Sequence, residues 1–342
     1  MKNKKWISLT AAVVLAVTTL PMTVVAAKKD VAEEKLMEVT LNEVAHSIFY
    51  APQYVAIEEG YFAEEGLDLT LVTGFGADKT MTAVISGEAD IGFMGAEASI
   101  YAYQEGATDP VVNFAQLTQR AGNFLVAREQ MADFKWEDLK GKKVLGGRKG
   151  GMPEMVFEYI LRKNGLDPQK DLAIDQSIDF GSTAAAFTGD DSAEFTVEFE
   201  PSATLLEKEN AGFVVASLGV DSGYVPYTSY SAKTSYIDKN PQIIQKFTNA
   251  LQKGMEYVQN HSPEEIAQVI APQFAETDLD TITTIVKRYH DQDTWKSDLI
   301  FEKESFELLE DILEEAGELK ERVEYKNLVN TEYARTPSPR FS

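Results

Sequence analysis

The amino-acid sequence predicts an α/β protein built as two lobes. The first observation is a repeated order of short apolar strand, glycine-bearing turn and helix, which is typical of βαβ units. The second is that this order breaks near residues 118–122 and again at 223–227, where we expect two hinge strands to cross between the lobes. The third is the length of 342 residues, which fits about two domains. We therefore expect residues 36–120 and 225–334 to form one lobe and residues 121–224 the other.

The first lobe is expected to repeat strand, turn and helix three times. Its first turn is a polar and aromatic loop that enters a helix at Pro52. Because strands in βαβ units are parallel, the turns should gather at the carboxyl edge of one sheet, where ligands bind. The expected strands of this part are Glu38–Leu41, Leu67–Val72, Ala89–Phe93 and Val111–Leu117, and the expected helices end at Gly60, Ser86 and about Gln104.

The second lobe is organised around one stretch, Asp138–Met155. A strand at Val144–Leu145 leads into a glycine-rich loop, and Pro153 fits the first position of a helix. The loop would point backbone N–H groups and a helix dipole at an anionic or carbonyl-bearing molecule. The alternative is an ordinary strand-to-helix turn, and the stretch is no P-loop because the Gly-Lys-Ser/Thr ending is missing. The other elements expected here are strands at Phe124–Ala127, Thr196–Phe199 and Phe213–Ser217, a helical turn at Trp136–Leu139, and helices after Asp179 and Pro201.

The C-terminal part is expected to be helical after a strand at Thr228–Ala232. Apolar residues recur at helical spacing beyond Asn240, which is most simply a stripe that faces the core. We expect further helices at Pro263–Phe274 and Asp280–His290, and a disordered polar tail at 335–342. The apolar stripe consists of Ile243, Phe247, Leu251, Met255 and Val258.

Composition excludes several classes of function. The chain has 55 acidic and 32 basic residues, a formal charge of −23, which argues against binding to nucleic acid or anionic membrane surfaces. It has no cysteine, so it has no disulfide, thiol nucleophile or thiolate metal site. The three histidines show no spacing typical of a metal site. We therefore expect no metal, no cofactor and no catalytic residue.

The N-terminus predicts export. Three lysines precede an apolar run from Ile7 to Leu20, and small residues follow at Ala26 and Ala27. This is the layout of a secretory signal peptide, so residues 1–27 are expected to be removed. The alternative is an uncleaved membrane anchor, since the whole run is nearly long enough to span a bilayer.

Four separated segments resemble one known family. They are residues 50–67, 87–99, 138–144 and 199–201, and they follow one another in the family's order. The chain resembles the substrate-binding proteins of ABC importers, in the SsuA/THI5-like group that takes up nitrate, sulfonates, taurine and thiamine-precursor pyrimidines. The resemblance implies a bilobed periplasmic-binding-protein-like fold of type II, which closes on a small-molecule solute.

The resemblance also implies the partners and the location of the protein. The partners would be an ABC permease and its ATPase in the membrane, and the protein itself is expected to be monomeric. It would lie in the periplasm or on the outer face of the cytoplasmic membrane. One departure is that the lipid-bearing cysteine common in Gram-positive relatives is missing.

The residues expected to bind the solute lie on the turns and at the two crossings. Most match ligand-facing loops of the family, and the polar residues at the crossings are neutral donors and acceptors of the kind that line such clefts. The expected ligand-binding residues are Ser47, Phe49, Tyr50, Gly76, Ala77, Gly95, Ala96, Glu97, Gln116, Thr118, Asn123, Arg148, Gly150, Gly151, Met152, Glu200 and Tyr224.

The charges in this set leave the class of solute open. Glu97 and Glu200 would favour a cationic or hydrogen-bond-donating solute if both face the cleft. Arg148 would instead favour a carboxylate or sulfonate. Each has a structural alternative: Glu97 could compensate a helix dipole, and Arg148 could be a solvated loop charge.

Two other functions remain as alternatives. One is a sensor or binding module with the same fold and no transporter, which the absence of neighbouring permease and ATPase genes would reveal. The other is an enzyme, because the fold also hosts pyrimidine-forming enzymes of thiamine biosynthesis. Those enzymes use a Cys-rich segment and an iron-binding histidine that this sequence lacks, and an export signal fits poorly with cofactor chemistry.

Overall fold

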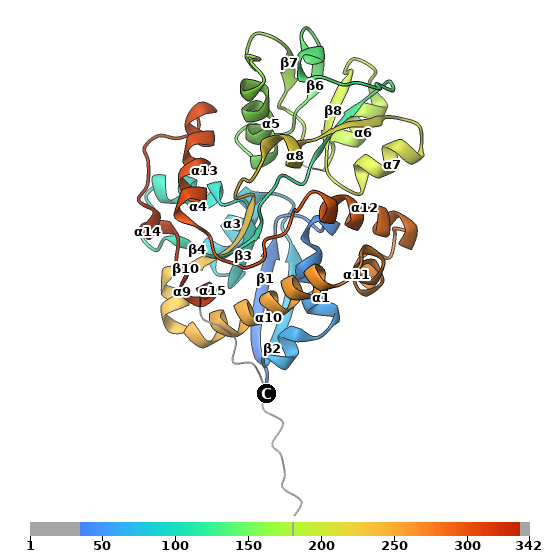
Figure 1. Cartoon of the computed structure of the whole chain (residues 1–342). Helices are drawn as coiled ribbons and strands as arrows, with labels where there is room; N and C mark the ends of the chain where they lie inside the picture. The colour runs from blue at the N-terminus through green and yellow to red at the C-terminus, as the bar shows by residue number, and fades with distance from the viewer. Residues whose placement is uncertain (1–34, 180, 336–342) are drawn as a thin grey trace, which may run out of the picture. The chain divides into compact units, whose positions relative to one another are not determined.

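The computed structural model describes residues 35–179 and 181–335 (Figure 1). The expected signal peptide at 1–27 and residues 336–342 of the expected tail lie outside these ranges. Arg335, the first residue of that tail, is the last residue of helix α15 (Glu332–Arg335). The described residues form two five-stranded sheets with helices packed around them, which confirms the α/β class.

The first sheet has the strand order β2-β1-β3-β10-β4. Strand β1 is parallel to β2 and β3, as expected for βαβ units, but β10 is antiparallel to both of its neighbours. The reason is that the chain leaves this sheet at Thr118 and returns beside it at Thr228, so β10 must run back along β4. The strands are β1 (Met37–Glu43), β2 (Leu67–Thr73), β3 (Ile91–Met94), β4 (Val111–Thr118) and β10 (Thr228–Lys233).

The second sheet has the order β7-β6-β8-β5-β9 and repeats this arrangement. Strands β6, β7 and β8 are parallel, whereas β5 is antiparallel to β8 and β9. Strand β7 was not expected from the sequence, because it is only three residues long and partly exposed. The strands are β5 (Phe124–Ala127), β6 (Lys143–Leu145), β7 (Ala173–Asp175), β8 (Phe195–Glu198) and β9 (Phe213–Ser217).

Helices cover both sheets, and we call each sheet with its own helices a lobe. The first lobe carries η1 (Ile48–Tyr50), α1 (Ala51–Glu58), α2 (Tyr61–Glu64), α3 (Ala77–Ser86) and α4 (Glu97–Gln104). The second carries η2 (Trp136–Leu139), α5 (Met152–Lys163), α6 (Thr183–Gly189), α7 (Ser202–Lys208) and α8 (Leu218–Ser222). The remaining helices are α9 (Thr234–Lys239), α10 (Pro241–Asn260), α11 (Pro263–Ile270), η3 (Ala271–Phe274), α12 (Leu279–Asp291), α13 (Lys303–Glu315), α14 (Tyr325–Leu328) and α15.

The C-terminal helices contact both lobes. Helix α10 packs on α1 of the first lobe, so closely that a Cβ added at Gly254 would lie 2.2 Å from the Pro52 carbonyl oxygen. Four residues of its apolar stripe are buried, and only Ile243 is partly exposed. Helix α12 is tied to α7 of the second lobe by an ion pair between Arg288 and Glu207, and α13 lies beside α5 (Figure 1). Among the described residues, no helix combines the length and the apolar character that crossing a membrane requires.

Candidate functional site

The two lobes meet around a cluster of aromatic side chains centred on Phe49. Phe49 lies in η1 at the end of the first strand-to-helix turn and is fully buried. Its ring centroid is 5.0 Å from that of Tyr50, 5.6 Å from that of Tyr227 and 5.2 Å from that of Tyr289. Phe199, which follows β8 of the second lobe, lies 6.0 Å away. One aromatic side chain of the first lobe therefore contacts residues from both crossings, the second lobe and α12.

A glycine makes this close approach possible. A Cβ added at Gly122, in the first crossing, would lie 2.5 Å from the Phe49 ring, so a larger residue would force the ring to move. The Gly122 carbonyl accepts a hydrogen bond from the Tyr289 hydroxyl at 2.7 Å. The Phe49 carbonyl accepts one from the Trp295 indole at 2.8 Å. Tyr289 thus ties the first crossing to the aromatic cluster, and Trp295 ties the turn that carries Phe49.

Glu97 places a carboxyl group between the lobes. It is the first residue of α4, and only 3% of it is exposed. Its carboxyl accepts a hydrogen bond from the backbone N–H of Met152, the first residue of α5 in the second lobe. Burial raises the pKa of Glu97 to about 8, while hydrogen bonds from the Met152 and Glu97 backbone N–H groups act in the opposite direction. Its Oε2 atom is buried and has no hydrogen-bond partner among the residues that the structure describes.

Three other buried polar side chains near the crossings also carry polar atoms that have no hydrogen-bond partner among the described residues. Gln116 in β4, Asn123 before β5 and Tyr227 before β10 are all at most 2% exposed. Within the described ranges, the Gln116 Oε1 atom, both polar side-chain atoms of Asn123 and the Tyr227 hydroxyl have no hydrogen-bond partner. Buried polar atoms nearly always have hydrogen-bond partners. A set of such atoms without partners is therefore suited to form hydrogen bonds with a bound ligand. Burial raises the pKa of Tyr227, and the charges of Tyr50 and Glu97 raise it further, which indicates that these groups lie near one another.

The glycine-rich loop before α5 uses its amides within the protein. The Gly150 N–H donates to Glu154 Oε2 at 3.2 Å, and the Gly151 N–H donates to the Arg148 carbonyl at 3.3 Å. The Tyr101 hydroxyl of α4 donates to the Gly150 carbonyl at 2.9 Å, which ties the loop to the first lobe. The Met152 N–H reaches the carboxyl of Glu97, as described above. The loop therefore lies at the lobe interface. The backbone N–H at the start of α5 is bonded to the Glu97 carboxyl of the protein itself.

Arg148 lies on the exposed rim of the interface. Its guanidinium pairs with the carboxylate of Asp78 at 3.2 Å, across the two lobes. Both side chains are more than half exposed, at 56% and 54%. Gly76 and Ala77 lie at the start of α3 beside Asp78, where Gly76 has φ +142° and its N–H donates to the Val44 carbonyl. The Arg148–Asp78 pair therefore links the two lobes at solvent-exposed positions.

Two predicted residues are engaged by the protein itself. The Glu200 carboxylate accepts hydrogen bonds from the Thr204 N–H and hydroxyl, each at 2.9 Å, and from the Arg288 guanidinium at 2.9 Å. Its backbone carbonyl accepts from the Ser47 hydroxyl at 3.2 Å, so Glu200 contacts the first loop through its main chain. Tyr224 is 57% exposed and donates to the Asp293 carboxylate at 2.6 Å.

The structure thus brings part of the predicted set together. Thr118 bonds to Thr228 at 2.5 Å where the two crossing strands meet, and Gly95 and Ala96 are buried beside Glu97. The predicted residues that are buried or half-buried on the turns and near the crossings are Ser47, Phe49, Tyr50, Gly95, Ala96, Glu97, Gln116, Thr118, Asn123, Gly150, Gly151 and Met152. The expected ligand-binding residues did not include Tyr227, Tyr289 or Phe199, although Tyr227 was expected at the second crossing, where it could be hinge packing alone. The position of Tyr227 at the second crossing indicated a possible role, whereas the sequence around Tyr289 indicates only an apolar residue on a helix.

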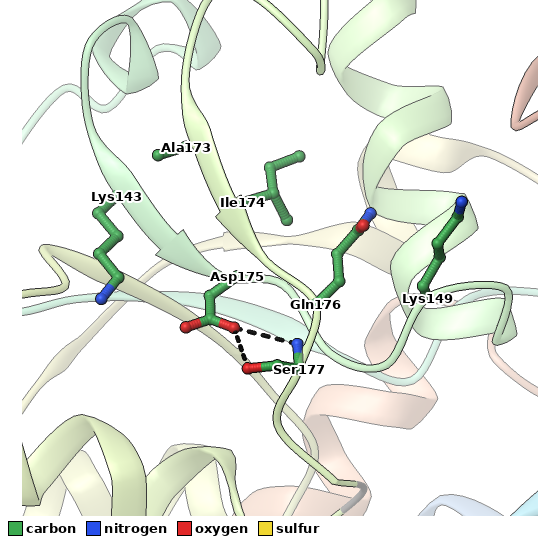
Figure 2. A pocket seen from close by; sticks show the side chains of 7 residues that line it. All are labelled: Lys143, Lys149, Ala173, Ile174, Asp175, Gln176 and Ser177. Atoms are coloured by element: carbon green, nitrogen blue, oxygen red, sulfur yellow. Dashed lines mark hydrogen bonds between the residues drawn. The ribbon is translucent and has the colours of Figure 1, made fainter.

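Two cavities lie away from this interface. One, of about 560 Å³, opens at the edge of the second sheet beside β7, where Lys143 and Lys149 lie on opposite sides of it (Figure 2). Asp175 in its wall accepts hydrogen bonds from the N–H and hydroxyl of Ser177 (Figure 2). The other, of about 390 Å³, lies along α13. The predicted solute-binding residues line neither cavity. No cluster of three His, Asp or Glu side chains suited to a metal ion occurs in the part of the chain that the structure describes.

Comparisons with known proteins match most of the chain. The family model described as NMT1/THI5 like matches residues 48–266. YtlA of Bacillus subtilis, named as a binding protein on a provisional basis, is 49% identical over 88% of this chain and 90% of its own length. A 4-amino-5-hydroxymethyl-2-methylpyrimidine phosphate synthase of Aspergillus parasiticus is 25% identical over 61% of this chain and 63% of its own.

Among solved structures, the alkanesulfonate-binding protein SsuA of Xanthomonas axonopodis, bound to MOPS, has a TM-score of 0.70 with this chain. It is 15% identical, and the match covers 87% of this chain and 99% of SsuA. This likeness confirms the fold predicted from the sequence, and the matched family confirms the resemblance on which that prediction rested.

Proposed function

Because this chain belongs to the NMT1/THI5-like family, we propose that it is an extracytoplasmic solute-binding protein that delivers a small organic molecule to an ABC importer. The observation that carries this proposal is the set of buried polar atoms without partners at the lobe interface. Glu97, Gln116, Asn123 and Tyr227 all contribute such atoms, and they come from elements on both sides of the two crossings. A protein interior leaves few such atoms unpaired, so their concentration here favours a solute that pairs with them.

The two crossings are the natural hinges for capture. They run side by side: the Val225 N–H donates to the Gln119 carbonyl at 2.9 Å, and the Tyr227 N–H donates to the Thr118 carbonyl at 3.4 Å. Rotation about these short segments would separate the lobes and expose the aromatic cluster. A solute then stabilises the closed form by the contacts it makes to both lobes, since only a difference in affinity can shift the equilibrium.

We assign the protein a binding role and no catalytic one. The partners in this proposal are a permease and an ATPase of the membrane, and the protein acts as a monomer outside the cytoplasm. Relatives in the family include a synthase, but the groups gathered here are hydrogen-bonding and aromatic side chains, which hold a molecule without supplying a nucleophile. The named binding role of YtlA supports the same assignment.

Thermal unfolding in the presence of candidate solutes tests the proposal. The panel contains taurine, methanesulfonate, nitrate, 4-aminopyrimidine and riboflavin, and a solute co-purified with the protein is identified by mass spectrometry. A cognate solute at 100 times its dissociation constant should stabilise the protein by about 2.7 kcal/mol. If neither the panel nor an extract of the growth medium contains a stabilising compound, the proposal is wrong.

A matched pair of variants shows whether the solute binds at the interface. Asn123→Leu removes two polar atoms that have no partner in the described structure, so it should abolish the solute-induced shift without destabilising the free protein. Asn113→Leu is the control: Asn113 is equally buried but bonds to Ser99, Ser229 and the Leu328 carbonyl. It should destabilise the protein and leave the solute-induced shift intact.

A further inference from the structure

The chemistry of the unpartnered atoms indicates which solutes the interface accepts. We propose that the solute is an uncharged or cationic molecule that donates hydrogen bonds to Glu97, and that Glu97 makes the site reject oxyanions. This inference rests on the proposed function and concerns the same site. It separates this chain from its structural neighbour SsuA, which is described as binding alkanesulfonates.

The first argument is the balance of donors and acceptors. The Gln116 amide N–H donates to the Thr118 carbonyl at 2.9 Å, which fixes the orientation of the amide and leaves its oxygen free. Asn123 offers one donor and one acceptor whichever way its amide is turned. With Glu97 Oε2 and with Arg120 Nε of the first crossing there are three acceptors and two donors, besides the Tyr227 hydroxyl, which can act as either. A complementary solute must therefore present mainly N–H or O–H groups.

The second argument is the position of the Glu97 carboxyl. It bonds to the N–H of Met152 at the start of α5, the point at which a helix would otherwise attract an anion. An oxyanion would have to displace this carboxyl or lie beside it at the same buried place. Once Glu97 is ionised, two like charges so close in a low dielectric repel strongly, so the ionised carboxyl excludes a solute with a full negative charge.

Two of the three arginines near the interface are paired with carboxylates. No Lys or Arg side chain is buried anywhere in residues 35–179 and 181–335. Arg148 pairs with Asp78 on the exposed rim, and Arg288 pairs with Glu200 and Glu207. Arg120 donates from Nη1 to the Gly219 carbonyl and stacks on the Tyr224 ring at 4.3 Å, while its Nε atom is buried and has no partner among the described residues. Arg148 and Arg288 are therefore paired with carboxylates, and Arg120 Nε is the guanidinium donor near the crossings that has no partner among the described residues.

The proton on Glu97 gives the inference a specific pH signature. A donor-bearing solute stabilises the carboxylate, so its binding should release a proton and strengthen as the pH rises from about 6 to 9. An oxyanion would bind only when the Glu97 carboxyl is protonated, so its binding should weaken over the same pH range. Tyr50 of η1, Tyr227 and Tyr101 of α4 face this carboxyl, and burial raises the pKa of each far above this range. Glu154 of α5 titrates in the same window, because burial raises its pKa to about 8, so Glu154→Gln is the control for this effect.

The decisive experiment compares wild-type protein with Glu97→Gln. Both are unfolded in denaturant to release bound molecules, refolded, and titrated at pH 6 and 9 with an oxyanion set and a donor set. The oxyanion set is nitrate, methanesulfonate and taurine, and the donor set is 4-aminopyrimidine, cytosine and riboflavin. Each protein is also equilibrated with an extract of the growth medium, and the retained molecule is identified by mass spectrometry.

The expected result is that wild-type protein retains an uncharged or cationic molecule. Its affinity should be at least tenfold higher at pH 9 than at pH 6, and Glu97→Gln should lower it at least tenfold and remove the pH dependence. Retention of an oxyanion that Glu97→Gln binds equally well would overturn this inference and leave the proposed function standing. If nothing is retained from the sets or the extract, the proposed function is wrong and this inference falls with it.

Discussion

Glu43 and Glu97 are both buried carboxyl groups of the first lobe, but their surroundings differ. Glu43, at the end of β1, is 0% exposed, and its two oxygens accept hydrogen bonds from four side chains. Glu97, at the start of α4, is 3% exposed, and one of its oxygens has no partner in the described structure. The four donors to Glu43 are His46 at 2.7 Å, Gln53 at 2.8 Å, Tyr54 at 2.8 Å and Thr73 at 3.0 Å.

The difference separates a structural carboxyl from a functional one. The Glu43 network fixes the loop that carries Phe49 and Tyr50, and His46 extends it by bonding to the Gln273 carbonyl at 2.8 Å. Both ring nitrogens of His46 face acceptors, so the doubly protonated imidazolium fits best, and the hydrogen bond to Glu43 raises the pKa of His46 accordingly. A fully satisfied network rigidifies the first lobe, whereas the unsatisfied set around Glu97 is completed only by another molecule.

The largest effect expected from this comparison is the loss of Glu43. Glu43→Ala leaves the buried donors of Gln53 and Tyr54 without this acceptor and also removes the partner of His46 and Thr73, so the free energy of unfolding should fall by about 3–5 kcal/mol. Urea denaturation of the free protein measures this change. Glu97→Ala is the matched control and should cost far less, because it removes a carboxyl that is only half paired. Equal losses for the two variants would contradict the distinction between the two carboxyls.

The next effect concerns two buried tyrosines. The Tyr54 hydroxyl donates to Glu43, whereas the Tyr227 hydroxyl has no partner among the described residues. Tyr54→Phe should therefore lower the free energy of unfolding by about 1.5–3 kcal/mol, the range for a hydrogen bond to a charged group. Tyr227→Phe should leave it unchanged or slightly higher and should weaken solute binding instead. Urea denaturation together with solute-induced thermal shifts compares the two, and a stability loss at Tyr227 would show that its hydroxyl is already paired.

These contrasts also explain what the sequence could predict of the fold. Apolar runs bounded by glycine located β5 and β9 to the residue, because both are short strands that begin and end at clear changes in hydropathy. Strand β7 and helix α8 were missed, because three and five residues carry too little pattern to stand out. The antiparallel course of β10 could not come from local pattern, since it depends on where the chain re-enters the first sheet after crossing twice.

The candidate site was predictable to a different degree. The turns that carry Phe49 and Glu97 could be located, because strand ends and helix starts mark them in the sequence. The direction of a side chain could not, as Glu200 shows: its carboxylate bonds to Arg288, 88 residues away along the chain. Tyr289 reaches the aromatic cluster from α12 for the same reason. Tertiary contacts decide which carboxyl has all its hydrogen-bond partners within the protein, and nothing in the local sequence distinguishes Glu97 from Glu200 in this respect.

The pH dependence of stability sharpens the description of Glu97. Burial raises its pKa to about 8 in the folded protein, above the value of about 4.3 expected for an unfolded chain. A raised carboxyl pKa means that the folded state holds the proton more tightly than the unfolded state does. The stabilisation that protonated Glu97 gives the folded state is therefore present below about pH 4.3 and is lost as the pH rises towards 8. Between pH 6 and 7, the wild-type protein should lose up to about 1.4 kcal/mol of unfolding free energy relative to Glu97→Gln.

Urea denaturation of both proteins at the two pH values measures this difference. Glu154 and Glu198, whose pKa values burial raises to about 8 and about 7, titrate in both proteins and cancel in the comparison. A difference that stays constant with pH would mean that Glu97 is already ionised in the folded protein throughout this range.

The smallest effect is expected on the rim, where Asp78 and Arg148 link the lobes in solvent. Because both side chains are more than half exposed, the pair should contribute less than about 1 kcal/mol, and Asp78→Asn should hardly change global unfolding. Its effect should appear in lobe separation instead, since the pair forms only when the lobes touch. The chain has no cysteine, so Glu88→Cys and Lys140→Cys, both at exposed positions, introduce a unique pair of sites for fluorescent labels.

Distances between these labels should show more open molecules for Asp78→Asn than for the wild type in about 0.1 M salt. In about 1 M salt the screening length falls from about 10 to 3 Å, so the two proteins should become alike. The interior of the interface, which salt cannot reach, should keep responding to solute in both. If Asp78→Asn opened the lobes equally at both salt concentrations, the pair would hold the lobes by packing and not by charge. The expected difference between the salt-sensitive rim and the salt-insensitive interior of the interface would then be wrong.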